Sequence, residues 1–165
     1  MIELVNFSDK HRDGLVNVLN QQEVIKWILM PPVPYFYEDA DSYIGRCREN
    51  LKSDDEYNFA IELEGKYIGG AVLRRIQEER NNAITGYSTG KEYWGKGYGT
   101  EALKKIIRFG FEKMKLQKIT AFIFEGNIAS EKILLKCGFI HDSFISKQVK
   151  KGKVTHNLKY FSIEG

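Results

Sequence analysis

The sequence predicts an α+β fold built on one mixed sheet. Strand-like and helix-like segments alternate in the middle of the chain, whereas pairs of strands joined by short turns dominate both flanks. The 165 residues fit a single domain, residues 1–165, because a chain of this length buries enough surface for one core. We expect a mostly antiparallel sheet of about seven strands, flanked by about four helices.

Periodicity places the elements of the first half. Alternation predicts a strand over Ile2–Phe7, and Ser8 with Asp9 then favours a helix start. A second helix begins near Glu38. Its apolar positions keep helical spacing: Ala40, Tyr43, Ile44, Cys47 and Leu51. Two strands around a Glu64–Gly65 turn form a hairpin: 59–63 and 67–76.

The second half alternates more regularly. A polar turn over Gln77–Asn82 leads into a strand over Ile84–Ser88 and a glycine-rich loop. A strongly amphipathic helix follows over Thr100–Met114, and a nearly continuous apolar run over Ile119–Phe124 predicts a buried strand. The remaining elements are a helix that Asn127 opens and Gly138 closes, and two strands at about 139–149 and 154–163.

Composition excludes several classes of protein. The hydrophobic fraction is 42% and the net charge only +3, which describes a soluble globular chain and does not predict nucleic-acid binding. No apolar run is long enough for a membrane span and the N-terminus lacks a leader pattern, so we expect a cytoplasmic protein, monomer or homodimer. No metal site is expected, since the cysteines lack ligand spacing and His11, His141 and His156 are scattered.

The most informative segment is the loop before the amphipathic helix. Gly95, Gly97 and Gly99 alternate there with Lys96 and Tyr98. Glycines at a helix N-terminus leave the backbone N–H groups unhindered, and the helix dipole attracts an anion to them. Lys96 adds a mobile positive charge, so the pattern indicates a phosphate-binding loop.

Two other phosphate-binding motifs fail at one position each. Residues 90–96 satisfy the spacing G-x-x-x-x-G-K, but Gly97 stands where that motif requires Ser or Thr for magnesium. The dinucleotide fingerprint G-x-G-x-x-G starts correctly at Gly95 but has Thr100 as its last residue. A plain glycine-rich turn that caps a helix is the remaining structural alternative.

Two motifs resemble the GCN5-related N-acetyltransferase (GNAT) superfamily. Residues 94–99, Trp-Gly-Lys-Gly-Tyr-Gly, resemble its pyrophosphate loop Arg/Gln-x-x-Gly-x-Gly/Ala, with Trp94 at the first position. Residues 127–139 resemble its Asn-x-x-Ser…Gly-Phe helix. The loop sequence, together with Pro31 to Ala40, is similar to the branch of ribosomal-protein N-acetyltransferases, RimJ/RimL-like. The resemblance is dense from Gly86 to Phe139 and thinner elsewhere.

The resemblance implies acetyl-CoA as co-substrate and a set of residues that bind it. Backbone around Tyr87 and Ser88 is expected to pair with pantetheine and to polarise the thioester carbonyl. Asn127 is expected to hydrogen-bond the pantetheine arm, although Asn is also a good helix N-cap. The amides that hold the pyrophosphate are those of Gly95, Lys96, Gly97, Tyr98, Gly99 and Thr100.

The catalytic groups depart from the family pattern. Ile84 stands where many relatives carry an acidic residue, and Leu134 where many carry a tyrosine acid. Ser130 matches a serine of RimL-like enzymes and is the candidate that stabilises or protonates the departing thiolate. A primary amine is mostly protonated at neutral pH, so it must lose a proton, here through ordered water. Trp27, Tyr35 and Tyr37 are candidate walls of the acceptor pocket, with core packing as the alternative.

The predicted function is acetyl transfer from acetyl-CoA to a primary amine by direct attack in a ternary complex. The acceptor is either a protein N-terminus or a small-molecule amine, and the sequence does not choose between them. A non-catalytic acyl-CoA-binding or sensing module is the alternative, because the acidic residue and the tyrosine are absent. Transfer of a longer acyl chain is a third hypothesis for the function.

Overall fold

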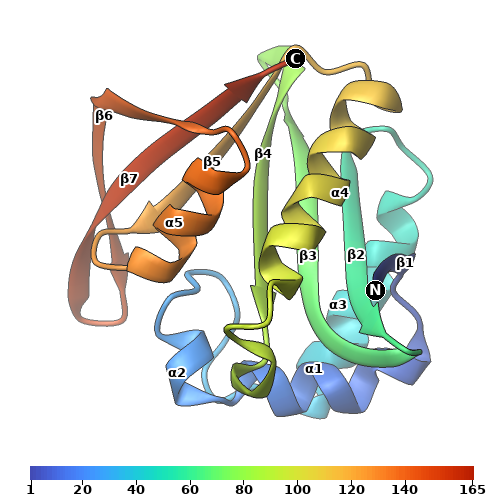
Figure 1. The fold of residues 1–165 in the computed structure, drawn as a ribbon. Coiled ribbons are helices and arrows are strands. Elements are labelled where there is room, and N and C mark those ends of the chain that lie inside the picture. Colours follow the sequence, from blue (N-terminus) through green and yellow to red (C-terminus); the bar gives the residue numbers. More distant parts are fainter.

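The computed structural model describes residues 1–165 and contains one seven-stranded sheet in the order β1-β2-β3-β4-β5-β7-β6 (Figure 1). The strands are β1 (Ile2–Asn6), β2 (Glu56–Leu63), β3 (Lys66–Ile76), β4 (Glu79–Thr89), β5 (Lys118–Phe124), β6 (Ile140–Lys151) and β7 (Val154–Glu164). The helices are α1 (Arg12–Leu19), α2 (Gln22–Ile25), α3 (Tyr37–Asn50), α4 (Tyr98–Glu112) and α5 (Ile128–Lys136), with 3-10 turns η1 (Asp9–His11) and η2 (Lys91–Tyr93).

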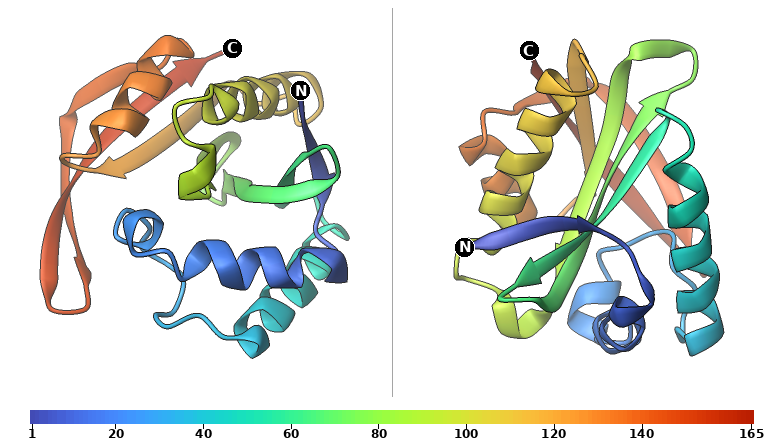
Figure 2. Two further views of the ribbon diagram at one scale, coloured as in Figure 1. Left: turned by 60° about the horizontal axis from the view of Figure 1, so that its bottom comes forward. Right: turned by 90° about the vertical axis from the view of Figure 1, so that its right-hand side faces the viewer.

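Helices cover both faces of this sheet. Every neighbouring pair of strands is antiparallel except β4 and β5, which run parallel. Helices α4 and α5 lie on one face, and α1, α2 and α3 lie on the other (Figure 2). The predicted α+β class, with a single mostly antiparallel mixed sheet, is confirmed.

Two apolar clusters hold the helices to the sheet. In the larger cluster, Leu103 of α4 packs with Leu73 and Ile119 of the strands, and all three are fully buried. In the smaller cluster, Leu15 of α1 and Ile44 of α3 cover the opposite face. Burying these side chains is the main favourable contribution to folding. None of the helices combines the length and the apolar character that crossing a bilayer requires.

One predicted turn is shorter in the structure, and one short helix was not predicted. The polar turn predicted over Gln77–Asn82 is shorter, because β4 already begins at Glu79. The first residues of β4 are exposed at the end of the sheet, and polar side chains are tolerated there because the ladder is formed by main-chain groups. The short helix α2 was not predicted, since four residues are too few to show a helical period.

The sheet opens between its two parallel strands. Strands β4 and β5 pair only from Asn82 with Lys118 to Thr85 with Ala121. Beyond Thr85, the two strands diverge, and the separation widens toward the bottom of Figure 1. One end of the β4–β5 pair is therefore closed by hydrogen bonds, and the other end is open.

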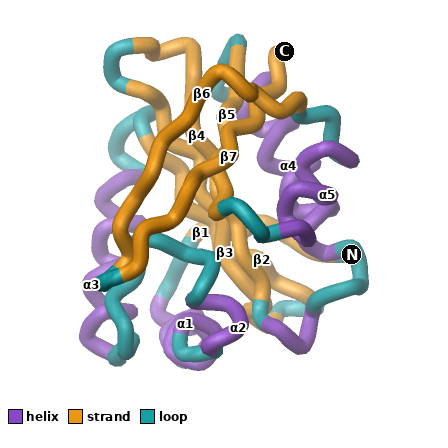
Figure 3. Tube along the Cα trace, turned by 90° about the vertical axis from the view of Figure 1, so that its left-hand side faces the viewer, coloured by secondary structure: helices purple, strands orange, loops and turns teal.

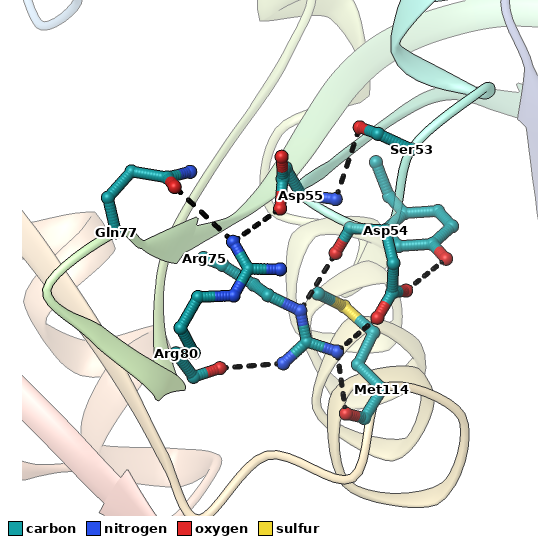
Figure 4. A network of polar contacts seen from close by, with 8 residues as sticks. Ser53, Asp54, Asp55, Arg75, Gln77, Arg80 and Met114 are labelled. Carbon is teal, nitrogen blue, oxygen red and sulfur yellow. Dashed lines mark hydrogen bonds and ion pairs between the residues drawn. The ribbon is translucent and has the colours of Figure 1, made fainter.

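A buried arginine braces the closed end of the sheet (Figure 4). Arg75 of β3 is 9% exposed. Its guanidinium donates to the carbonyl oxygens of Asp54 (2.8 Å), Arg80 (2.7 Å) and Met114 (2.8 Å), and it also pairs with the Asp54 carboxylate. Arg80 pairs in turn with Asp55. Asp54 precedes β2, Arg80 lies in β4 and Met114 follows α4, so the Arg75 side chain ties three elements together.

The β6–β7 hairpin closes the structure on the other side, from which Figure 3 views the molecule. Lys151, the last residue of β6, donates hydrogen bonds to the carbonyl oxygens of Ile25 and Ile28. Burial lowers the pKa of this lysine. A carbonyl oxygen has two lone pairs, so Ile25, which already accepts from the N–H of Ile28, can also accept from the ammonium group. This contact holds the hairpin turn against the segment that follows α2.

Candidate functional site

One edge of β4 loses its partner strand where β5 diverges. The N–H of Gly90 donates to the carbonyl oxygen of Ile68 in β3 at 2.8 Å. In an antiparallel pair, residues that face the partner alternate with residues that face away from it. Gly86 and Ser88 therefore direct their backbone groups at β3. Ser88, which was expected to pair with pantetheine, has its N–H and C=O committed to the sheet.

The alternate residues, Tyr87 and Thr89, direct their backbone groups to the side that β5 has left. The carbonyl oxygen of Thr89 accepts a hydrogen bond from the indole N–H of Trp94 (3.0 Å). The edge at Tyr87 offers both an N–H and a C=O at the spacing of an extended chain. An extended amide-containing ligand can pair with such an edge as an added strand does. Thr89 is not among the predicted site residues, because a hydrophobic pattern does not show toward which neighbouring strand a backbone group points.

The glycine loop lies directly after this edge, at the start of α4. Gly95 (φ +73°) and Gly97 (φ +84°) adopt left-handed backbone conformations, and a Cβ on either would meet nothing within 4 Å. Gly97 is the N-cap of α4, and no side chain caps the helix. The first-turn N–H groups are thus open to an anion, as the sequence predicts. Lys96 is exposed beside them and takes part in none of the ion pairs.

Gly99, the third glycine of the loop, has a different role. It is helical, and a Cβ there would lie 3.3 Å from the ring of Tyr87 and 3.3 Å from the side chain of Ile133 in α5. The missing side chain therefore lets β4 and α5 pack closely against the first turn of α4. Its N–H still belongs to the same first turn as those of Tyr98 and Thr100.

Asn127 and Ser130 lie together at the start of α5. The Asn127 side chain accepts a hydrogen bond from the N–H of Ser130 at 3.3 Å, so the N-cap interpretation is confirmed. Ser130 lies on α5 one helical turn before Ile133, which shares the Gly99 contact with the Tyr87 ring. Burial raises the pKa of Tyr87, and the nearby Ser130 side chain offsets part of that rise. The structure thus brings together Tyr87, Ser130 and the loop from three elements.

The two positions that depart from the family pattern contain no proton donor or acceptor in their side chains. Leu134 of α5 is 1% exposed and belongs to the larger core cluster. Ile84 is half-buried and pairs with Thr120 of β5. Both positions are occupied by packing residues, so Ser130 remains the candidate polar group on α5.

The three histidines are packed against other side chains. His11 is 1% exposed, accepts from the N–H of Ser8 and bonds Glu62 at 2.7 Å. His156 stacks on Phe124 with ring centroids 4.3 Å apart, and His141 lies 5.1 Å from the ring of Phe161.

The structure separates the three aromatic residues predicted for the acceptor pocket. Only Trp27 approaches the β5–α5 turn, where its ring lies 4.0 Å from the position of a Cβ on Gly126. Tyr35 is 4% exposed in the smaller core cluster, where burial raises its pKa to about 12. Tyr37 is exposed at the start of α3 with the Arg12 guanidinium 4.3 Å above its ring. These surroundings favour core packing for Tyr35 and leave Trp27 beside the site.

Two surface cavities lie away from the β4 edge. One, of about 480 Å³, is lined by residues of α1 and the β2–β3 turn and by Tyr93. The other, of about 520 Å³, lies at the closed end of the sheet beside Asn82 and Lys118. Neither includes the glycine loop. The candidate site is an exposed strand edge and helix terminus, and such a surface is shallow without its ligand.

Comparison with known proteins agrees with this geometry. The family described as acetyltransferase (GNAT) domain matches residues 2–140. Probable N-acetyltransferase YjcK of Bacillus subtilis is 32% identical over 132 residues, covering 78% of this chain and 73% of the relative. Spermidine N(1)-acetyltransferase of Escherichia coli is 26% identical over 137 residues, covering 79% of this chain and 72% of that protein.

A solved structure shares the fold over nearly the whole chain. Ribosomal-protein-S5-alanine acetyltransferase from Vibrio fischeri superposes with a TM-score of 0.87 at 19% identity, covering 99% of this chain and 92% of the other. The matched family domain fits the open β4 edge and the glycine loop described above. The chain belongs to the GNAT acetyltransferase family and is an acetyl-CoA-dependent N-acetyltransferase.

Proposed function

We propose that the protein transfers the acetyl group of acetyl-CoA to a primary amine by direct attack in a ternary complex. The observation that supports this most strongly is the junction of two binding surfaces. The unpaired backbone of β4 at Tyr87 leads, through Thr89 and Trp94, into the open N-terminus of α4 at Gly97. A donor with an amide-containing arm and a pyrophosphate needs both surfaces in this order.

The residues at the junction fit such a donor. Tyr87 offers one backbone N–H and one backbone C=O, which can pair with the amides of the extended pantetheine arm. Open space around Gly95 and Gly97 lets the pyrophosphate approach the first-turn amides of α4, from Tyr98 to Thr100. The exposed ammonium of Lys96 adds attraction for the phosphates. Asn127 caps α5 with its side-chain oxygen and has its amide N–H groups free for the pantetheine arm.

Acetyl-CoA supplies an activated acyl carbon and a good leaving group. A bond forms between the amine nitrogen and the acyl carbon, the carbon–sulfur bond breaks, and its electron pair goes to sulfur. Ser130 is the residue that stabilises the sulfur anion. The amine gives its proton to ordered water, since Ile84 provides no base. Such an enzyme gains rate as pH rises and more of the amine is neutral.

We propose the chemical class of the acceptor, a primary amine, and not its identity. One relative is named for spermidine and one fold neighbour for the alanine of a ribosomal protein, so both small amines and protein N-termini are candidates. Trp27 lies beside the β5–α5 turn and is the aromatic residue we assign to the acceptor side. Tyr35 and Tyr37 were candidates for the same role, and their surroundings give them less support.

The experiment measures acetyl-CoA binding by calorimetry and coenzyme A release with a thiol reagent. The amine panel contains a peptide with an N-terminal alanine, spermidine, free amino acids and an aminoglycoside. We expect saturable binding and thiol release with at least one amine. Binding without release on any amine favours the acyl-CoA-binding module, for which Leu134 and Ile84 are the supporting observation. Release with octanoyl-CoA faster than with acetyl-CoA favours the longer-chain reading.

A further inference from the structure

The hydroxyl of Tyr87 is an exception among the buried polar groups. Its oxygen is inaccessible to solvent and has no hydrogen-bond partner of normal geometry. Nearly all buried polar atoms in folded proteins have a partner, because an unpaired one forfeits its hydrogen bonds to water. Asn58 Nδ2 is the one other such side-chain atom, and the same residue bonds Tyr43 through Oδ1. The unpaired hydroxyl of Tyr87 lies at the candidate site, and a role at that site would explain it.

The surroundings of this hydroxyl are built from the other site elements. The Tyr87 ring packs against Gly99 of α4, which has no Cβ to obstruct it. The same Gly99 position also meets Ile133 of α5 at 3.3 Å, and Ser130 lies one helical turn before Ile133 on α5. Burial raises the Tyr87 pKa, the nearby Ser130 side chain offsets part of that rise, and the Tyr87 hydroxyl forms no hydrogen bond. No carboxylate or ammonium takes part in a hydrogen bond with the phenol.

We propose that Tyr87 is a positioning residue for Ser130, and this inference rests on the proposed function. When coenzyme A is bound, the Tyr87 hydroxyl donates a hydrogen bond to Ser130 Oγ. The single hydroxyl proton of Ser130 is then free to point at the sulfur. A chain of two hydroxyls that ends on an anion is cooperative, because each hydrogen bond polarises the next.

The arrangement works by hydrogen bonding and moves no proton from Tyr87. Burial raises the pKa of this phenol, so it stays protonated and acts as a donor. The electron pair of the broken carbon–sulfur bond remains on sulfur, where the Ser130 hydroxyl hydrogen-bonds to it. The proton that completes the thiol comes from solvent, which also receives the amine proton.

The test uses Tyr87→Phe, Ser130→Ala and the double variant. Tyr67→Phe is the matched control, because Tyr67 is a partly buried tyrosine that packs under α1 on the opposite face of the sheet. Three quantities are measured: kcat and KM for acetyl-CoA, the pH titration of the coenzyme A thiol in the binary complex by its ultraviolet absorbance, and the Tm of the free protein.

We expect Tyr87→Phe to lower kcat about 10-fold with KM for acetyl-CoA unchanged, and the double variant to be no slower than Ser130→Ala. The bound thiol should titrate about one pH unit higher in each site variant. The Tm of Tyr87→Phe should be unchanged or higher, since an unpaired buried hydroxyl is removed. Tyr67→Phe should leave kcat and the thiol titration as in the wild type.

Several results would overturn the inference. One is a Tyr87→Phe protein with wild-type turnover and an unshifted thiol titration. Multiplicative effects in the double variant, or a Tm loss in Tyr87→Phe, would show that the hydroxyl acts independently or structurally. If the wild-type protein binds no coenzyme A, the proposed function fails as well. If the wild type binds coenzyme A normally but the thiol titration does not shift in Tyr87→Phe, only this inference fails and the proposed function stands.

Discussion

The indole N–H of Trp94 donates a hydrogen bond to the carbonyl oxygen of Thr89 at 3.0 Å. Thr89 is the last residue of β4, and Trp94 immediately precedes the glycine loop. The bond therefore joins the strand edge to the loop and bridges the η2 turn between them. It also satisfies a carbonyl that β5 no longer pairs. The relative position of the strand edge and the loop, the two surfaces we propose for the coenzyme, depends on this contact.

Replacing Trp94 with phenylalanine keeps an aromatic ring but removes the donor. Trp94 is 44% exposed, so little core packing is lost and Tm should change by less than about 2 °C. Without this hydrogen bond the loop is held less firmly, so binding must also fix the loop in place. The Kd of the variant for acetyl-CoA should therefore rise about 5-fold. Calorimetric titration measures the Kd of the wild type and of Trp94→Phe. Equal Kd values would show that Trp94 does not contribute to acetyl-CoA binding.

Gly97 is the loop position at which a side chain should harm binding most. Its φ of +84° costs an alanine about 1–2 kcal/mol, although no atom blocks the added Cβ. Gly97→Ala should weaken acetyl-CoA binding about 10-fold or more. Gly45→Ala is the control, since Gly45 lies within α3 with open space around it, and alanine there should stabilise by about 0.5–1 kcal/mol. Equal affinities for the two variants would contradict the loop assignment.

Arg75 should matter for stability and not for binding. Arg75→Met leaves the Arg80 and Met114 carbonyl oxygens without their donor, which should lower stability by about 2–3 kcal/mol and Tm by about 5–10 °C. Arg12→Met is the control, because the Arg12–Asp41 pair is exposed and should change Tm by less than about 2 °C. Thermal unfolding measures both, and acetyl-CoA affinity at 25 °C should match the wild type in each. A similar Tm loss in the two variants would mean that Arg75 does not brace the closed end.

Glu62 should make stability depend on acidic pH. Its carboxylate accepts hydrogen bonds from Lys10 (2.7 Å) and His11 (2.7 Å), and these partners, Lys10 foremost, hold its pKa below the usual range. Because the folded pKa is lower than the unfolded one, the stabilisation is complete above about pH 4.3 and is lost as pH falls through the folded pKa. Glu62→Gln should lower Tm at pH 7, and the difference should shrink below pH 4.

The measurement is Tm against pH for Glu62→Gln and the wild type. Glu49→Gln is the control, because Glu49 pairs with Lys52 in an exposed helical position. A wild-type advantage that grows as the pH falls would reverse the sign and contradict this account of Glu62.

Much of this architecture could be predicted from local patterns. The apolar spacing of α4 and the unbroken apolar run of β5 come from side chains that reach the core, and so they appear in the sequence. The glycine loop was recognisable because Gly95 and Gly97 need backbone conformations that other residues avoid.

The features that create the site depend on contacts distant in sequence. The length of the β4–β5 ladder, which ends at Thr85, is set by how two strands twist apart and leaves no trace in periodicity. The meeting of Tyr87 with Ser130 joins residues of β4 and α5, and its purpose cannot be read from either segment alone. The hydrogen bond from Trp94 to Thr89 is likewise a consequence of the η2 turn, which was not predicted.

The most direct test of the account is residue-resolved amide hydrogen exchange by NMR, without and with acetyl-CoA. The account predicts that acetyl-CoA slows exchange at Tyr87, whose N–H has no strand partner, and at Tyr98, Gly99 and Thr100 in the first turn of α4. The amide of Ser88, which already bonds β3, should change little. Slower exchange confined to other segments, with Tyr87 and the α4 turn unaffected, would contradict the placement of the coenzyme and the function built on it.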